Sequence, residues 1–157
     1  MATVSVRNFT RYQVPRFPYE RIARTVVPGW DVSLAFVGPS KAKALNEALR
    51  DKTYTPNVLS YEAGKRSGEI IICPTIAKQQ SPEYGLTTDD FILLLFIHAL
   101  LHLKGLPHGA TMEARERKLV AKFARGSVNQ YKNATKNSDR HRHRNLSGKD
   151  GRPRRAA

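Results

Sequence analysis

The segment that most constrains the fold is the apolar run FILLLFIHALLHL at residues 91–103. In a helical projection this run is apolar on every side, so a helix formed there has to be enclosed by protein. Thr87 or Thr88 provides the N-terminal cap, and Gly105 ends the helix. We therefore expect a central buried helix around which the other elements pack.

The remaining segments predict strands and helices that can enclose this helix. Strands are predicted at residues 2–9, 31–38, 57–62 and 68–73. Helices are predicted at residues 19–27, 41–51, 74–81 and 111–126, with Ser40 as the cap of the second. The order of these elements predicts an α+β fold, with one sheet of about four strands packed with helices.

Positive charge is distributed unevenly along the chain, whose formal net charge is +14. Residues 126–157 hold nine Lys or Arg and two Asp, a net charge of +7, with almost no large apolar side chains. Because such a segment cannot offset its ordering entropy, we expect a domain at residues 1–125 and a disordered basic tail at 126–157. The tail favours polyanionic partners, and Tyr131 and the run HRHR at 141–144 are candidates for contacts with nucleic acid bases.

The cysteine content and the length of the apolar runs indicate in which cellular compartment the protein is expected. The single cysteine, Cys73, cannot form an internal disulfide and lies in the apolar run EIIIC, so a buried thiol in a reducing compartment is the simplest interpretation. The N-terminus lacks the apolar core of a signal sequence, and no run reaches the roughly 18 apolar residues that span a membrane. We therefore expect a cytoplasmic protein with no membrane partner.

Three histidines lie within the eleven residues HALLHLKGLPH. His98 and His102 are four residues apart, so they leave the same face of the helix one turn from each other. The helix ends at Gly105, and a short loop can bring His108 back to the same point. Three neutral imidazoles and one open position are typical of a catalytic zinc site, whereas unpaired buried imidazoles would cost about 1–3 kcal/mol per polar atom. We therefore expect one Zn²⁺ ion bound by these three histidines.

The same histidine spacing occurs in the metzincin proteases, H-E-x-x-H-x-x-G-x-x-H, but this chain lacks their general base. In those proteases the glutamate after the first histidine accepts a proton from the zinc-bound water. Here that residue is Ala99, which cannot accept a proton. Met112 lies on a charged helix only four residues after His108, so a Met-turn is not indicated either. A peptidase is therefore disfavoured.

Three segments together carry a resemblance to a known family. HALLHLKGLPH is similar to the pattern H-G-x-L-H-L-x-G-Y-D-H, and GEIIIC is similar to a G-D-I-x-I-x strand. LNEALRDKTYTPNVLSYE, at residues 45–62, is similar to L-N-x-x-x-R-x-x-D-x-P-T-[DN]-V-L-S-F. These patterns belong to the YbeY family, small metal-dependent endoribonucleases of bacterial ribosomal RNA maturation, and their order and spacing agree from about Val4 to Phe123.

The resemblance implies roles for particular residues. It implies that His98, His102 and His108 are the zinc ligands, and that Arg50 is the active-site arginine that takes part in RNA binding or cleavage. Without the resemblance, Arg50 could equally be a solvated cation at a helix C-terminus. Ser60 is a candidate for lining the cleft or for a structural hydroxyl.

The chain departs from the family pattern close to the histidines. Ala99 stands in place of the usual glycine, and Leu106 and Pro107 stand in place of the usual Tyr-Asp. That aspartate could support a metal ligand through a hydrogen bond. Its replacement by Pro107 is therefore expected to affect the orientation of the ligand, the affinity for the metal or the rate of the reaction.

The resemblance implies a zinc-dependent endoribonuclease that takes part in ribosomal RNA processing. Its expected reaction is the maturation of the 3′ end of 16S rRNA, with ribosomal RNA and the small ribosomal subunit as partners. The alternative is a ribosome-associated RNA-binding assembly factor in which zinc mainly stabilises the fold. Cleavage of a precursor RNA with and without a chelator separates the two.

Overall fold

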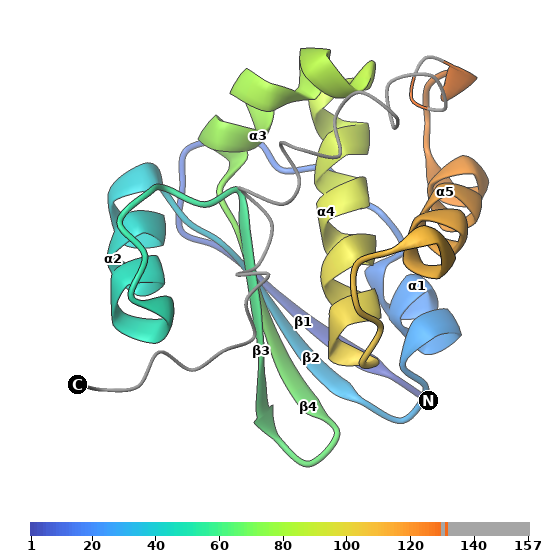
Figure 1. The fold of residues 1–157 in the computed structure, drawn as a ribbon, viewed down its shortest axis with the longest axis horizontal. Helices are drawn as coiled ribbons and strands as arrows, with labels where there is room; N and C mark the ends of the chain where they lie inside the picture. Colours follow the sequence, from blue (N-terminus) through green and yellow to red (C-terminus); the bar gives the residue numbers. More distant parts are fainter. Residues whose placement is uncertain (130, 132–157) are drawn as a thin grey trace.

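The computed structural model describes residues 1–129 and 131, and it confirms the predicted α+β fold with one four-stranded sheet (Figure 1). The strands are β1 (Thr3–Asn8), β2 (Asp31–Phe36), β3 (Val58–Gly64) and β4 (Ser67–Ile72). The helices are α1 (Tyr19–Val26), α2 (Pro39–Arg50), α3 (Pro74–Gln80), the 3-10 helix η1 (Ser81–Tyr84), α4 (Thr88–Leu103) and α5 (Ala110–Phe123).

The sheet has the strand order β1-β2-β4-β3. Strands β1, β2 and β4 are parallel, whereas the edge strand β3 is antiparallel to β4. The register places Leu34 between Val6 and Ile70. Helix α1 connects the parallel strands β1 and β2, as a crossover between parallel neighbours requires.

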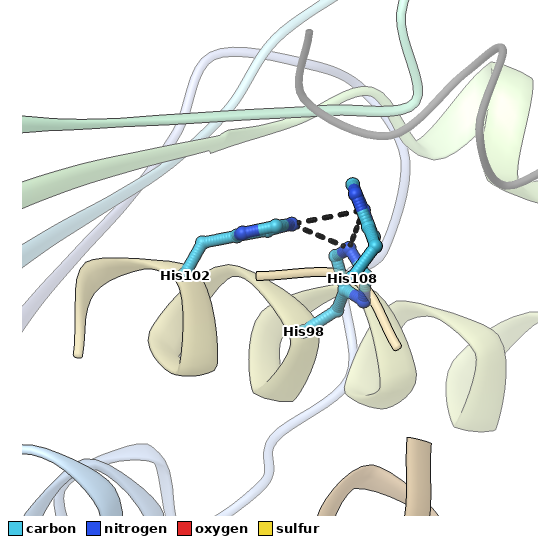
Figure 2. Close-up of side chains that lie close together, drawn as sticks. All are labelled: His98, His102 and His108. Carbon is cyan, nitrogen blue, oxygen red and sulfur yellow. Dashed lines mark hydrogen bonds between the residues drawn. The ribbon is translucent and has the colours of Figure 1, made fainter. Parts of the chain in front are cut away.

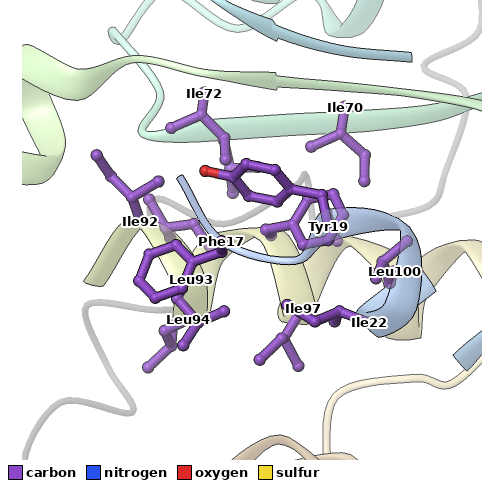
Figure 3. Close-up of a cluster of buried hydrophobic side chains, with 14 of the residues drawn as sticks. Phe17, Tyr19, Ile22, Ile70, Ile72, Ile92, Leu93, Leu94, Ile97 and Leu100 are labelled. Atoms are coloured by element: carbon purple, nitrogen blue, oxygen red, sulfur yellow. The ribbon is translucent and has the colours of Figure 1, made fainter. Parts of the chain in front are cut away.

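The two faces of the sheet carry different layers of helix. One face packs against α1 and α4, and α5 packs on α4 (Figure 1). The strands contribute alternate residues to this layer, among them Val32, Leu34, Phe36, Ile70 and Ile72, the last two of which are labelled in Figure 3. The other face packs against Ala42 and Leu45 of α2 in a smaller cluster that includes Leu59, Ile71 and the buried thiol of Cys73. The period of two along each strand therefore separates the two layers.

Helix α4 is the central buried helix that the apolar run predicts. Every residue from Asp90 to Leu101 is buried. The side chain of Thr87 accepts a hydrogen bond from the backbone N–H of Asp90 at 3.1 Å and caps the helix. The buried carboxylate of Asp90 accepts hydrogen bonds from the backbone N–H groups of Arg125 and Gly126, each at 2.9 Å. The buried carboxylate of Asp90, in the first turn of α4, therefore has its hydrogen-bond partners in the segment that follows α5.

Two local predictions were wrong. Helix α2 begins at Pro39 with Gly38 as its N-cap, so Ser40 lies inside the helix instead of capping it. The fixed φ of proline suits the first turn, where its missing N–H costs nothing. Tyr131 is fully buried, which excludes the expected contact of its ring with bases.

The predicted tail lies mostly outside the described residues. Residues 126–129 and 131 are described, whereas the run HRHR at 141–144 and the expected disorder of residues 132–157 lie outside them. The boundary at residue 125 stays a prediction.

No single helix in residues 1–129 is long and apolar enough to cross a membrane. Among the described residues, one pair of helices, Pro74–Tyr84 and Thr88–Leu103, has the length and composition of a membrane span when the two are taken together, but the pair is bent by 101°.

Gly68 allows α4 to approach the sheet closely. A Cβ atom placed on Gly68 would lie 2.6 Å from a methyl carbon of Leu103, the last residue of α4. Real Cβ atoms do not approach other atoms this closely, so the side chain of Leu103 or the helix would have to move. The glycine at the start of GEIIIC therefore leaves room for the buried side chain of Leu103 at the end of α4, next to His102.

Gly68→Ala is expected to lower the free energy of unfolding by about 1–3 kcal/mol, because it overpacks a buried contact. Leu103→Ala alone should cost about 2–5 kcal/mol through the cavity that it leaves. The double variant should lose less free energy of unfolding than the sum of the losses of the two single variants, since the smaller side chain at position 103 makes room for the new methyl group at position 68. Urea denaturation of all four proteins measures this coupling, and strictly additive values would contradict the proposed contact.

Candidate metal centre

His98 and His102 leave one face of α4, as their spacing predicts (Figure 2). His98 is buried and His102 is half-buried, so the centre lies between the core and solvent. The distance between their Nε2 atoms is 3.0 Å. Successive turns of a rigid, buried helix therefore fix two of the three candidate ligands.

The turn after α4 brings His108 to the same point. The N–H of Gly105 donates to the carbonyl of His102 at 2.9 Å, and the N–H of Leu106 donates to the carbonyl of Leu101 at 3.1 Å. This pair of bonds is the Schellman motif, which requires a left-handed residue, and Gly105 has φ +103°. The chain reverses there, and the Nε2 atom of His108 lies 3.1 Å from that of His102 and 3.3 Å from that of His98.

The three Nε2 atoms form a triangle that fits one small cation. A tetrahedral Zn²⁺ ion with Zn–N bonds of about 2.0–2.1 Å requires nitrogen atoms about 3.3–3.4 Å apart, close to the observed 3.0–3.3 Å. A neutral imidazole has one lone pair and one N–H, so three converging nitrogen atoms cannot satisfy one another fully. A cation held by His98, His102 and His108 would accept all three lone pairs.

Glu116 of α5 determines which nitrogen of His98 faces this centre. Its Oε2 atom accepts a hydrogen bond of 2.6 Å from Nδ1 of His98. With the proton on Nδ1, the Nε2 atom presents its lone pair to the other two histidines. The other carboxylate oxygen, Oε1, accepts a hydrogen bond of 2.9 Å from the hydroxyl of Tyr131. Glu116 and Tyr131 are both fully buried, so water does not compete for these bonds.

His102 is held in the neutral form that a metal ligand requires. Its pKa is lowered from 6.5 to about 3, chiefly by burial and in smaller part by the neighbouring imidazoles of His98 and His108, whereas Glu116 acts in the opposite direction. Its ring also forms a hydrogen bond with the backbone of Leu106. His98 is therefore supported by Glu116, and His102 by the backbone of the loop.

Sequence reasoning missed Glu116 and the burial of Tyr131. The signal was present, because Met112, Glu116 and Val120 are spaced by four residues and share the buried face of α5. A carboxylate within an otherwise apolar helical stripe indicates a buried partner. Tyr131 gave no such signal, since its neighbours in the sequence are polar.

The structure places the other candidate residues on three different elements, α2, β3 and α4. Arg50 is the last residue of α2, the helix on the opposite face of the sheet from α4, and it is half-buried. Ser60 is half-buried on β3 opposite Ile70, hence on the sheet face that α4 covers. Ala99 is buried inside α4. The roles of Arg50 and Ser60 stay predictions.

The fold and the site define an α+β protein with a three-histidine centre of the metal-binding type at the end of its buried helix. A family model described as Endoribonuclease YbeY matches residues 10–130. The chain therefore belongs to the YbeY family, and the resemblance inferred from the motifs is confirmed.

Individual relatives agree with this assignment. The chain is 31% identical over 103 residues to the endoribonuclease YbeY of Thiobacillus denitrificans, covering 59% of this chain and 70% of that protein. It is 37% identical over 100 residues to the endoribonuclease YbeY of Nautilia profundicola, covering 59% and 72%. The solution structure of TM1509 from Thermotoga maritima aligns with a TM-score of 0.56 at 20% identity, covering 86% of this chain and 93% of that one. That structure supports the fold.

Glu116→Gln is expected to weaken zinc binding by about tenfold or more, because loss of such a supporting carboxylate typically costs 10–100-fold in metal affinity. Tyr131→Phe removes the hydroxyl that holds Glu116 and should give a smaller loss in the same direction. Competition with a chromophoric chelator measures both affinities. Glu20→Gln, at an exposed position of α1, is the control and should bind zinc like the wild type. Wild-type affinity of Glu116→Gln would show that the bond does not orient His98.

The metal-free protein is expected to lose stability in acid through His102. Its pKa is about 3 in the folded chain and 6.5 when unfolded, so the unfolded state binds the extra proton as the pH falls below about 6.5. Between pH 7 and pH 5 the wild type should therefore lose about 1–2 kcal/mol more than His102→Gln, which cannot take up this proton. Urea denaturation at the two pH values measures the difference, and equal losses would contradict the depressed pKa.

Proposed function

We propose that this protein is a zinc-dependent endoribonuclease that acts in ribosomal RNA processing. The convergence of the three Nε2 atoms within 3.3 Å carries the proposal, because three imidazole nitrogen atoms at this spacing suit a single bound cation. Family membership supports RNA as the substrate, since the relatives described above are named endoribonuclease YbeY.

The histidines would hold the ion, and α5 would orient them. His98, His102 and His108 are the proposed ligands, with Glu116 fixing the tautomer of His98. A bound Zn²⁺ ion supplies Lewis-acid chemistry at a phosphodiester, by polarising a phosphate oxygen or by lowering the pKa of a water molecule. The chain offers no carboxylate at position 99 to accept a proton, which separates the proposal from the protease mechanism.

Arg50 is the proposed phosphate-binding residue. Its guanidinium has the fork geometry that binds two phosphate oxygens, and it would offset the negative charge that develops during displacement at phosphorus. Support for the assignment comes from its place in the segment that resembles the family's second motif, at residues 45–62.

The proposed substrate is a single-stranded precursor at the 3′ end of 16S rRNA, bound with the small ribosomal subunit in the cytoplasm. The net charge of +14 supports a polyanionic partner of this kind. Zinc is preferred among divalent ions because three imidazoles and one open position match its catalytic sites.

Chelation of the metal is expected to abolish cleavage of a precursor 16S RNA, and Zn²⁺ should restore it. His108→Ala should lower the rate by at least about a hundredfold, since it removes one of the three ligands. Arg50→Lys should retain part of the rate, because lysine keeps the charge but not the bidentate geometry. Single-turnover cleavage on gels, with zinc content measured on the same preparation, reads out all of these effects.

The controls separate an enzyme from an assembly factor. Lys78→Gln, at an exposed position of α3, should cleave like the wild type. Undiminished cleavage by metal-free protein would refute the proposed metal dependence. A zinc-loaded protein that binds the RNA without cleaving it would instead favour the assembly factor in which zinc is structural.

A further inference from the structure

Helices α1 and α5 together present a positively charged surface that the proposed reaction does not use. We call it the α1/α5 basic face. It consists of six exposed residues: Arg21, Arg24, Arg115, Lys118, Lys122 and Arg125. Figure 1 shows α1 and α5 side by side, on the sheet face that also carries α4.

The cations of α5 lie on a single side of that helix. Arg115, Lys118 and Lys122 follow each other at spacings of three and four residues, so they share one face. The opposite face buries Met112, Glu116 and Val120. The carboxylate of α5 that supports the metal centre is therefore turned inward, whereas its cations are turned outward.

Contacts with two aromatic rings link α1 to α5, and the segment before α1 to the segment after α5. The guanidinium of Arg21 lies 5.3 Å from the ring centroid of Phe123, and the ammonium of Lys122 lies 5.4 Å from the same centroid. The guanidinium of Arg125 lies 4.5 Å from the ring centroid of Phe17. These rings hold the cations in place without neutralising them, so their charge stays available to a partner.

Carboxylates leave most of this charge uncompensated. Within residues 1–129, only Arg125 of the six cations lies within ion-pair distance of a carboxylate, with its Nη1 atom 3.9 Å from Asp89. Glu20 is exposed next to Arg21, and Glu113 lies half-buried at the start of α5. An uncompensated patch of this kind on two rigid helices favours a polyanion.

We propose that the α1/α5 basic face binds the phosphate backbone of the RNA substrate at a distance from the metal centre. This inference rests on the proposed function, which supplies RNA as the polyanion. Helix α5 begins two residues after His108, so the chain runs from the loop that carries a proposed metal ligand directly into the helix that carries this face. The nine Lys and Arg residues of the segment 126–157 follow directly, so the cationic sequence continues beyond α5.

The geometry of α5 sets the size of the expected effect. Arg115 and Lys122 are seven residues apart on α5, which corresponds to about 10 Å along the helix, enough for more than one phosphate. Each neutralised phosphate of single-stranded RNA contributes about 0.7 to the slope of log K against log salt concentration. Loss of the whole face should therefore change the slope measurably, and not only the affinity.

The test compares two variants with the same change in net charge. One replaces Arg21, Arg115, Lys118 and Lys122 by Gln. The matched control replaces Lys41, Lys43, Lys65 and Lys78, exposed lysines of α2, the β3–β4 turn and α3, by Gln. Fluorescence anisotropy measures binding of a labelled single-stranded 2′-O-methyl phosphorothioate RNA, checked to remain intact, to the zinc-loaded full chain between about 50 and 200 mM salt. Thermal unfolding confirms that both variants are folded.

The α1/α5 variant should bind the RNA at least about tenfold more weakly at low salt, with a salt slope smaller by about 2 to 3. The control variant should show a much smaller loss of affinity and a much smaller change in the salt slope. Equal losses in the two variants would overturn the inference and leave the proposed endoribonuclease standing. A selective loss in a protein that cleaves no RNA would instead support the binding face and refute the proposed function. Selective loss of binding to anionic phospholipid vesicles, with RNA binding unchanged, would identify a membrane face and also overturn the inference.

Discussion

The burial of α4 on all sides is the constraint on which the rest of the structure depends. The sheet covers it on one side, and α1 and α5 cover it on others (Figures 1 and 3). Each large apolar side chain enclosed in this way contributes about 1.5–3 kcal/mol. The same enclosure makes polar groups costly, so those on α4 need partners. Asp90 has the N–H groups of Arg125 and Gly126, and His98 has Glu116.

The candidate metal centre is therefore a polar part of the core. Two of its histidines are fixed by a helix that cannot rotate without exposing apolar surface, and the third depends on the turn at Gly105. Glu116 adds a buried charge, whose desolvation is compensated by hydrogen bonds from His98 and Tyr131. The same residues take part in core packing and in the geometry of the site, so a substitution that alters the packing also alters the positions of the histidines.

Sequence reasoning succeeded where a strong local pattern sets the outcome. The apolar run, the period of two in β2 and the four-residue spacing of His98 and His102 each predict a local geometry that the structure has. It failed where two local signals compete or where the partner is distant. Pro39 outweighed Ser40 at the start of α2, because a fixed φ stabilises the first turn more directly than a hydroxyl does. The burial of Tyr131 depends on α5, which no property of its own neighbours encodes.

The sequence by itself determined the α+β class, the central helix and the spacing of the three histidines, because periodicity and spacing are properties of neighbouring residues. The family followed from the resemblance of three motifs. Only the tertiary structure decided that Glu116 faces His98, that Tyr131 lies against Glu116, and that Asp90 binds the chain after α5. These contacts join residues 15 to 36 positions apart. Packing of whole elements brings such residues together, and the pattern within any one element is compatible with several packings.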